Sequence, residues 1–229
     1  MNAAFHRWHV LIPVKALARA KSRLAAVGDR RPDVALAFAR DTALAALRCE
    51  AVSSVTVVTD DPMVAWAMRA DGALILAEGS VPELNGALAS AFNAMADVDN
   101  VAVLLGDLPA LTPATLACAL ILADLHATAF VPDARGTGTT LLTGRTVAAM
   151  RPRFGPGSAS AHAKAGAVRL ESPRLERLRT DVDDLADLRE ATRLGVGYHT
   201  RRVLHDLDPR TGWFIDGPRD HRTAVSHDL

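Results

Sequence analysis

The sequence predicts an α/β fold built around a parallel sheet. Short apolar segments typical of strands alternate along the chain with longer segments typical of helices. The clearest strand is residues 101–105, VAVLL, an unbroken apolar run of the kind that is buried on both faces of a parallel sheet. The chain has 229 residues, 49% of them hydrophobic, and is therefore long enough to bury a full core in one domain. We expect this domain to span residues 1–204.

The other elements follow from local patterns. Thr112 and Pro113 predict a helix start after the 101–105 strand, as N-cap and first helical residue, and Gly195 predicts the end of the last helix. Beyond Leu204 the pattern ends, so residues 205–229 are expected to form a tail that is partly docked or disordered. The expected strands are residues 8–14, 54–58, 73–77, 101–105, 127–131, 167–170 and 174–178, and the expected helices are residues 31–50, 63–70, 84–96, 113–124, 158–165 and 184–194.

Composition argues against several classes of protein. The formal net charge is zero, so nothing indicates binding to nucleic acid or to a membrane surface. The two cysteines, Cys49 and Cys118, fit small core residues better than a disulfide framework or a zinc site. The chain lacks an apolar stretch of about 20 residues and the N-terminal regions of a signal peptide. We therefore expect a soluble cytoplasmic protein, and no pattern predicts its oligomeric state.

Aspartates at the ends of expected strands are candidates for a metal site. Asp107 follows the 101–105 strand at once, and ligands of open α/β sheets bind beyond the carboxyl ends of the strands. Asp181 and Asp183 alternate along an extended segment, so both carboxylates can meet one cation. Mg²⁺ prefers such oxygen ligands and shares them with substrate phosphates. The alternative is that Asp107 only caps a turn.

A basic loop follows the first expected strand. It contains Lys15 and, close together, Lys21 and Arg23; three cationic groups just past a strand suit a polyphosphate, although a solvated basic loop fits the same residues. No glycine-rich Walker loop is present. Asn85 opens the helix expected at residues 84–96, and its amide fits either recognition of a nucleotide base or a helix cap.

Two glycine-rich connections are further candidates for anion binding. Residues 132–144, PDARGTGTTLLTG, contain Gly136 and Gly138, which permit backbone N–H groups to face an anion, and neighbouring threonine hydroxyls. Residues 151–162, RPRFGPGSASAH, place Ser158 as the cap of a short helix, whose free N–H groups suit an anion, with His162 nearby. A turn without a ligand remains the alternative for the first of these loops.

Five segments in order resemble a known family. They are PVKALARAKSRL, GDLPALT, PDARGTGTT, RFGPGS followed by His162, and TDVDDLADL. Over residues 10–194 the chain resembles the 2-phospho-L-lactate guanylyltransferases and their bacterial relatives, the phosphoenolpyruvate guanylyltransferases, which act in making coenzyme F-420. The resemblance implies a single Rossmann-like nucleotidyltransferase domain, a three-layer GT-A-like fold with a mixed central sheet. It also implies that GTP and a small phosphorylated three-carbon acid react to give a guanylylated product and pyrophosphate.

The resemblance also assigns roles to residues of this chain. It implies a partner enzyme that consumes the product, and it leaves open whether the acid is phosphoenolpyruvate or 2-phospho-L-lactate. The implied residues are Asp107, Asp181 and Asp183 for Mg²⁺, Asp107 and Lys21 for catalysis, Lys15, Lys21 and Arg23 for the nucleotide phosphates, Asn85 near the base or ribose, and Thr140, Gly155 and Ser158 for the acid.

Two other kinds of function fit parts of the pattern. A guanylyltransferase for the molybdenum cofactor, or a nucleotidyltransferase for a sugar phosphate, would normally open with an LxAGxGxR loop, which this chain lacks. A nucleotide-binding module without turnover would not need three carboxylates at strand ends. Release of pyrophosphate in an assay separates this second alternative from an enzyme.

Overall fold

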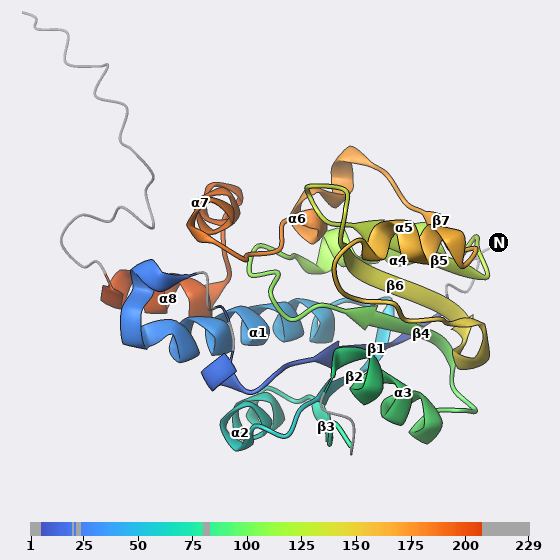
Figure 1. Cartoon of the computed structure of the whole chain (residues 1–229), viewed down its shortest axis with the longest axis horizontal. Coiled ribbons are helices and arrows are strands. Elements are labelled where there is room, and N and C mark those ends of the chain that lie inside the picture. Colours follow the sequence, from blue (N-terminus) through green and yellow to red (C-terminus); the bar gives the residue numbers. More distant parts are fainter. Residues whose placement is uncertain (1–5, 20, 22–23, 80–82, 208–229) are drawn as a thin grey trace, which may run out of the picture.

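The computed structural model describes residues 6–19, 21, 24–79 and 83–207 (Figure 1). Seven strands form one sheet in the order β3-β2-β1-β4-β6-β5-β7. The strands are β1 (Trp8–Pro13), β2 (Val52–Val58), β3 (Leu74–Leu76), β4 (Asp99–Leu104), β5 (Thr128–Pro132), β6 (Thr139–Thr146) and β7 (Val168–Arg169). The helices are α1 (Arg31–Leu47), α2 (Pro62–Ala70), α3 (Leu84–Ala94), α4 (Pro113–Ala123), α5 (Ser158–Lys164), α6 (Glu176–Arg179), α7 (Leu185–Leu194) and α8 (Tyr198–Leu207), with short 3-10 segments at Leu17–Arg19, Ala25–Arg30, Val147–Ala149 and Pro173–Leu175.

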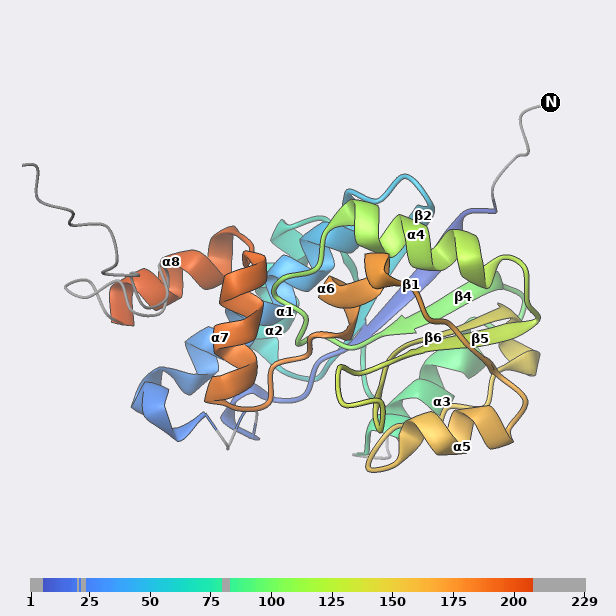
Figure 2. The ribbon, with the colours of Figure 1, turned by 90° about the horizontal axis from the view of Figure 1, so that it is seen from above.

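The sheet lies between two layers of helices, as Figure 2 shows for α4 on one side and α3 and α5 on the other. Apolar side chains of α1, α2 and α4 pack against one face of the sheet in a single buried cluster. Side chains of α3 and α5 pack against the other face in a second cluster. A third cluster joins α1 to α7 and α8, outside the sheet. The predicted three-layer α/β fold is confirmed.

The sheet is mixed, as the family resemblance implied, because β6 runs antiparallel to both of its neighbours, β4 and β5. The pairs β1–β2, β1–β4, β2–β3 and β5–β7 are parallel. The prediction that residues 132–144 form a connection is wrong from Thr139 onward, where strand β6 begins. Residues 139–146, TTLLTGRT, pair on both sides, and the β-branched threonines fit such a strand well despite the glycine.

Two other expectations about the chain differ from the structure, and a third concerns residues that the structure does not describe. Residues 174–178 are helical rather than a strand, because Ser172 caps the segment through the N–H of Arg174 and Pro173 begins it. A further helix, α8, follows Gly195 and continues to Leu207, past the predicted domain end at Leu204. Arg23 and residues 208–229, most of the predicted tail, lie outside the described residues. None of the described helices combines the length and apolar character needed to span a membrane.

Candidate functional site

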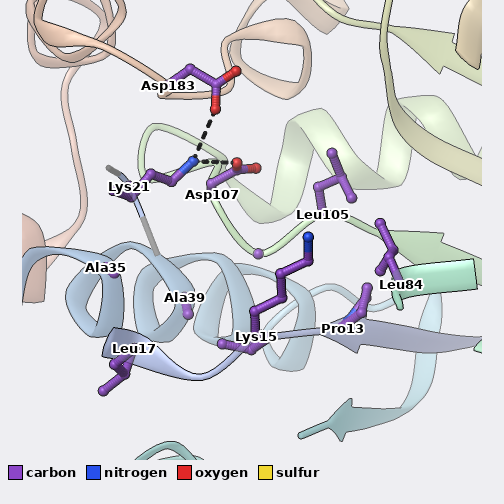
Figure 3. A pocket seen from close by; sticks show the side chains of 12 residues that line it. Pro13, Lys15, Leu17, Lys21, Ala35, Ala39, Leu84, Leu105, Asp107 and Asp183 are labelled. Atoms are coloured by element: carbon purple, nitrogen blue, oxygen red, sulfur yellow. Dashed lines mark hydrogen bonds and ion pairs between the residues drawn. The ribbon is translucent and has the colours of Figure 1, made fainter. Parts of the chain in front are cut away.

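The strand-end position of Asp107 results from the way β4 stops. The strand ends at Leu104, and the loop that carries Asp107 leads to Thr112, whose hydroxyl caps α4 through the N–H of Thr115. Beside this loop lies a cavity of about 300 Å³, lined by the end of β1 and the loop after it, by α1 and the first residue of α3, and by Asp107 and Asp183 (Figure 3). The predicted position beyond the carboxyl ends of β1 and β4 is therefore the position of a real cavity.

Three carboxylates from two parts of the chain meet here, and two of them, Asp107 and Asp183, line the cavity. One oxygen atom each of Asp107, Asp181 and Asp183 lies within 4.8 Å of the others. The N–H of Val182 donates to the carbonyl oxygen of Asp107 at 3.1 Å, which joins the two segments directly. The carboxylate of Asp187, in the first turn of α7, accepts the N–H of Asp183 at 3.0 Å. The backbone therefore holds the acidic triad in place.

Lys21 supplies a positive charge to this triad. Its Nζ lies 2.5 Å from Oδ2 of Asp107 and 3.3 Å from Oδ1 of Asp183, as Figure 3 shows. Burial alone would lower the pKa of Lys21, but the two ion pairs outweigh burial and raise it, so the side chain stays charged. Burial, together with the charges of Asp107 and Asp183, raises the pKa of Asp181 to about 7.

The donor set fits a divalent cation. Oδ1 of Asp107 is buried and has no hydrogen-bond partner among the residues that the structure describes. A buried carboxylate oxygen without a partner is unfavourable unless a hydrogen-bond donor or a cation binds to it. Burial is the main cause of the raised pKa of Asp181, and the nearby charges of Asp107 and Asp183 add to it, because one ammonium group does not neutralise three carboxylates. Carboxylate oxygens are the ligands that a hard cation such as Mg²⁺ takes.

The basic loop after β1 borders the same cavity. Figure 3 shows Lys15 projecting into it from the residues that follow β1. The loop is held by Asp61, whose Oδ2 accepts the N–H of Leu17 at 2.9 Å while its Oδ1 caps α2. The structure thus brings Lys15 and Lys21 to the cavity, while the third predicted cation, Arg23, is outside the described residues.

The backbone N–H groups of the loop between β5 and β6 bind the carboxylate of Asp133, a residue of the same loop. The carboxylate of Asp133 accepts the N–H groups of Thr137 at 2.9 Å and Gly138 at 2.8 Å. The expectation that these N–H groups face an external anion is therefore wrong. A Cβ atom at residue 138 would lie 2.5 Å from Oδ2 of Asp133, which explains why glycine stands there. Thr140 is fully buried, and its hydroxyl donates to the carbonyl oxygen of Val131 at 3.4 Å.

The loop before α5 is tied to α3 by Asn85. The amide nitrogen of Asn85 donates to the carbonyl oxygen of Phe154, and its oxygen accepts the N–H of the same residue, both at 2.9 Å. These bonds use one N–H hydrogen and one oxygen lone pair of the Asn85 amide, so this side chain joins two segments of the chain whatever else it contacts. The helix cap is Gly157 instead of Ser158, which is the first residue of α5 and only 2% exposed. Gly155 has φ +130°, and a Cβ atom there would meet no atom within 4 Å.

His162 is a neutral structural group rather than a charged anion ligand. It is 1% exposed, and its Nε2 accepts the N–H of Arg153 at 2.9 Å, so the ring proton lies on Nδ1 and donates to Thr139 at 2.9 Å. The ring also packs against Phe130 and Phe154. Burial, with a smaller effect from the charge of Arg153, lowers the pKa of His162 to about 4.

We expect this histidine to make stability depend on pH. Because its pKa is about 4 in the folded chain and about 6.5 in the unfolded chain, the unfolded chain takes up the proton first as the pH falls. The free energy of unfolding should therefore drop by about 3 kcal/mol between pH 6.5 and pH 4. Urea unfolding across this range should show the drop in the wild type and a flatter profile in His162→Gln. Parallel profiles for the two proteins would contradict the assignment.

Sequence reasoning missed the residues that hold the site together. Thr42 and Asp133 bond to the backbone of the loops around Asp107 and Thr137, and Asp61 anchors the basic loop. Thr42 and Asp61 carry no local signal, because their partners lie 66 and 44 positions away in the chain. Asp133 could have been found, since an aspartate at the start of a glycine-rich turn often bonds the backbone that follows it.

Similarity to known proteins agrees with the geometry. The chain is 46% identical over 206 residues to the phosphoenolpyruvate guanylyltransferase of Streptomyces coelicolor, covering 88% of this chain and 97% of that one. It is 47% identical over 221 residues to the enzyme of the same name from Streptomyces avermitilis, covering 94% and 100%.

Solved structures support the fold. A candidate nucleotide-diphospho-sugar transferase from Desulfovibrio desulfuricans superposes with a TM-score of 0.66 at 18% identity, covering 89% of this chain and 96% of that one. A cytidylyltransferase from Leptospira borgpetersenii superposes with a TM-score of 0.57 at 13% identity, covering 93% and 98%. The model of the family described as "Guanylyl transferase CofC like" matches residues 8–214. The chain therefore belongs to this guanylyl transferase family.

Proposed function

We propose that the protein transfers GMP from GTP to phosphoenolpyruvate and releases pyrophosphate, giving enolpyruvyl-diphospho-guanosine for the synthesis of coenzyme F-420. The observation that carries the proposal is the acidic triad with Lys21 beside a cavity at the end of β4. Relatives that are 46–47% identical over most of the chain bear the name of this activity. The proposed substrates are cytoplasmic metabolites, so we assign the reaction to the cytoplasm.

The acidic triad and the lysines of the loop after β1 have different proposed roles. Asp107, Asp181 and Asp183 would hold Mg²⁺, which when bound neutralises charge on the phosphate oxygens. Lys21 and Lys15 supply positive charge to the GTP phosphates from the loop after β1, and we assign the same role to Arg23, two positions after Lys21 in the sequence. Because Lys21 is mostly buried, with 12% of its side chain exposed, its attraction for a phosphate oxygen is screened less than that of a surface lysine.

The reaction itself needs little acid–base chemistry. A phosphate oxygen of the acid attacks the α-phosphorus of GTP, and a new P–O bond forms as the bond to the bridging oxygen of pyrophosphate breaks. Pyrophosphate leaves with that electron pair. Since a phosphate monoester has its second pKa near 6, the attacking oxygen is ionised at neutral pH without a general base. The protein therefore acts mainly by positioning the two phosphates and by neutralising charge.

We assign the acid to Gly155 and Ser158, at the loop before α5, and to Thr140 of β6. The open face of Gly155 supports this, because a ligand can approach the backbone there. The N–H of Ala159 donates to the carbonyl oxygen of Thr137, so this loop and the β5–β6 loop are held against each other. Asn85 adds rigidity by bonding Phe154.

Variants of this loop should affect the acid rather than GTP. Ser158→Ala should raise the KM for phosphoenolpyruvate about tenfold, as loss of one hydrogen bond to a charged group does. Gly155→Val should be more severe, because valine strains the backbone at φ +130° and fills the open face. Gly166→Val is the matched control: residue 166 also has positive φ and open space, but lies after the end of α5. Titration with GTP should show near-normal affinity in all three variants. Loss of GTP binding in Ser158→Ala and Gly155→Val would mean that this loop binds the nucleotide and not the acid.

Product analysis tests the function as a whole. The purified protein is incubated with GTP, Mg²⁺ and either phosphoenolpyruvate or 2-phospho-L-lactate, together with an enzyme that consumes the unstable product. Pyrophosphate release with phosphoenolpyruvate is the expected result. If only 2-phospho-L-lactate supported turnover, the proposed acceptor would be wrong. If only a molybdopterin or a sugar phosphate did so, the proposed class of acceptor would be wrong. No turnover with any of these acceptors would favour a nucleotide-binding module.

A further inference from the structure

One peptide group lies at the centre of the acidic triad. The carbonyl oxygen of Asp107 accepts the N–H of Val182 at 3.1 Å, and Val182 stands between the other two aspartates. The N–H of the same peptide group, which belongs to Leu108, donates to Oγ1 of Thr42 at 3.1 Å. Displacement of this peptide group would move the backbone that carries the Asp107 side chain and so change the distance of its carboxylate from Asp181 and Asp183.

Thr42 is well placed to fix that peptide group. It lies on α1 and is fully buried, and its hydroxyl hydrogen is directed to the carbonyl oxygen of Phe38 at 2.9 Å. This bond leaves a lone pair of the oxygen facing the N–H of Leu108, whose side chain is also fully buried. Without the hydroxyl, that N–H would be buried and unpaired, which is unfavourable. Hydrogen bonds at both ends of one peptide group also strengthen each other.

The preceding residue of α1 holds the same loop by a second route. The carboxylate of Asp41 accepts the N–H groups of His199 at 3.0 Å and Thr200 at 2.8 Å, at the start of α8. Just before these residues, the N–H of Gly197 donates to the carbonyl oxygen of Pro109 at 2.9 Å. Two consecutive residues of α1 thus fix the backbone from Asp107 to Pro109, one directly and one through α8.

We infer that Thr42 is a positioning residue for the acidic triad: its hydroxyl holds the Asp107–Leu108 peptide group in the orientation that gives the three carboxylates their affinity for a divalent cation. The inference rests on the proposed metal site. Thr42 touches neither cation nor substrate and acts through the backbone of Asp107. Groups that orient metal ligands typically change metal affinity 10- to 100-fold when they are removed.

Isothermal titration of the full chain with Mg²⁺ tests the inference without using activity. Thr42→Val keeps the shape of the side chain and removes the acceptor, and we expect its Mg²⁺ affinity to fall at least tenfold. Thr42→Ser keeps the hydroxyl and should bind within about twofold of the wild type. If the valine variant is insoluble, Thr42→Ala carries the same expectation, because it removes the hydroxyl without adding bulk.

Thr143→Val is the matched control. Thr143 is 1% exposed in β6, and its hydroxyl also bonds a backbone carbonyl, that of Ala129 at 3.1 Å. We expect this variant to melt at a lower temperature and to bind Mg²⁺ as the wild type does. If the Thr42 variants that lack the hydroxyl bind Mg²⁺ as the wild type does, the role of Thr42 is wrong but the metal site stands. Absence of Mg²⁺ binding in the wild type, or unchanged binding in Asp107→Asn, would overturn the metal site itself and the inference with it.

Discussion

Replacement of Asp107 by asparagine should reduce turnover with GTP and phosphoenolpyruvate by a factor of 10² to 10³ in the presence of Mg²⁺. Such a factor corresponds to about 3–4 kcal/mol of lost charge stabilisation in the transition state. The fold should change little, because asparagine has nearly the same shape and Lys21 keeps its ion pair with Asp183. Three carboxylates become two, so less negative charge is concentrated at the site. Steady-state kinetics and thermal melting of the same preparation measure both effects.

Asp124→Asn is the control for this experiment. Asp124 also forms ion pairs, with His6 and Arg145, but it caps the far end of α4, just before β5 begins. Its variant should keep wild-type turnover. Near-normal turnover of Asp107→Asn with Mg²⁺ would show that the triad is not the catalytic metal site, whatever its geometry suggests.

Most of the sheet could be predicted because its parallel strands are buried. Expected strands 8–14, 101–105 and 127–131 differ from β1, β4 and β5 by at most two residues at either end. β6 escaped prediction because it mixes threonine, glycine and arginine and directly follows a glycine-rich turn. Its place is decided by pairing with residues of β4 and β5 that lie at least 37 and at least 7 positions away in the chain, and local sequence does not report such pairing.

The three candidate metal-binding aspartates could be predicted from the sequence, but the residues that hold the surrounding loops could not. Asp107 follows from the rule that ligands bind beyond the carboxyl ends of strands, and Asp181 and Asp183 follow from their alternation along an extended segment, although the structure places that segment after helix α6 and not after a strand. The bonds from Thr42 to Leu108 and from Asp61 to Leu17 join segments distant in the chain, and neither threonine in a helix nor aspartate before a proline is unusual enough to attract attention. Likewise, nothing in the glycine-rich segment 132–144 distinguishes an external anion from the internal carboxylate of Asp133.

Replacement of Lys21 by methionine should affect both stability and turnover, and Mg²⁺ should separate the two effects. In the metal-free protein this lysine is the cation paired with Asp107 and Asp183. Removing one partner of a buried ion pair costs about 3–5 kcal/mol, and we expect about 2 kcal/mol here because 42% of the Asp183 side chain is exposed to water. The loss should shrink as the pH falls from 8 to 6, since protonation of Asp181, whose pKa burial and the neighbouring carboxylates raise to about 7, relieves the repulsion within the triad.

Added Mg²⁺ should restore most of this stability, because the cation replaces the missing ammonium charge between the carboxylates. Turnover should stay low, about 10²-fold below the wild type, because the positive charge next to the GTP phosphates is still absent. Lys15→Met is the matched control: Lys15 borders the same cavity but is exposed, so its loss should leave the melting temperature in chelator unchanged. Equal melting temperatures of wild type and Lys21→Met in chelator would mean that the ion pairs with Asp107 and Asp183 contribute nothing to the metal-free fold. Recovery of turnover along with stability on adding Mg²⁺ would mean that Lys21 serves the triad alone and does not contact the nucleotide.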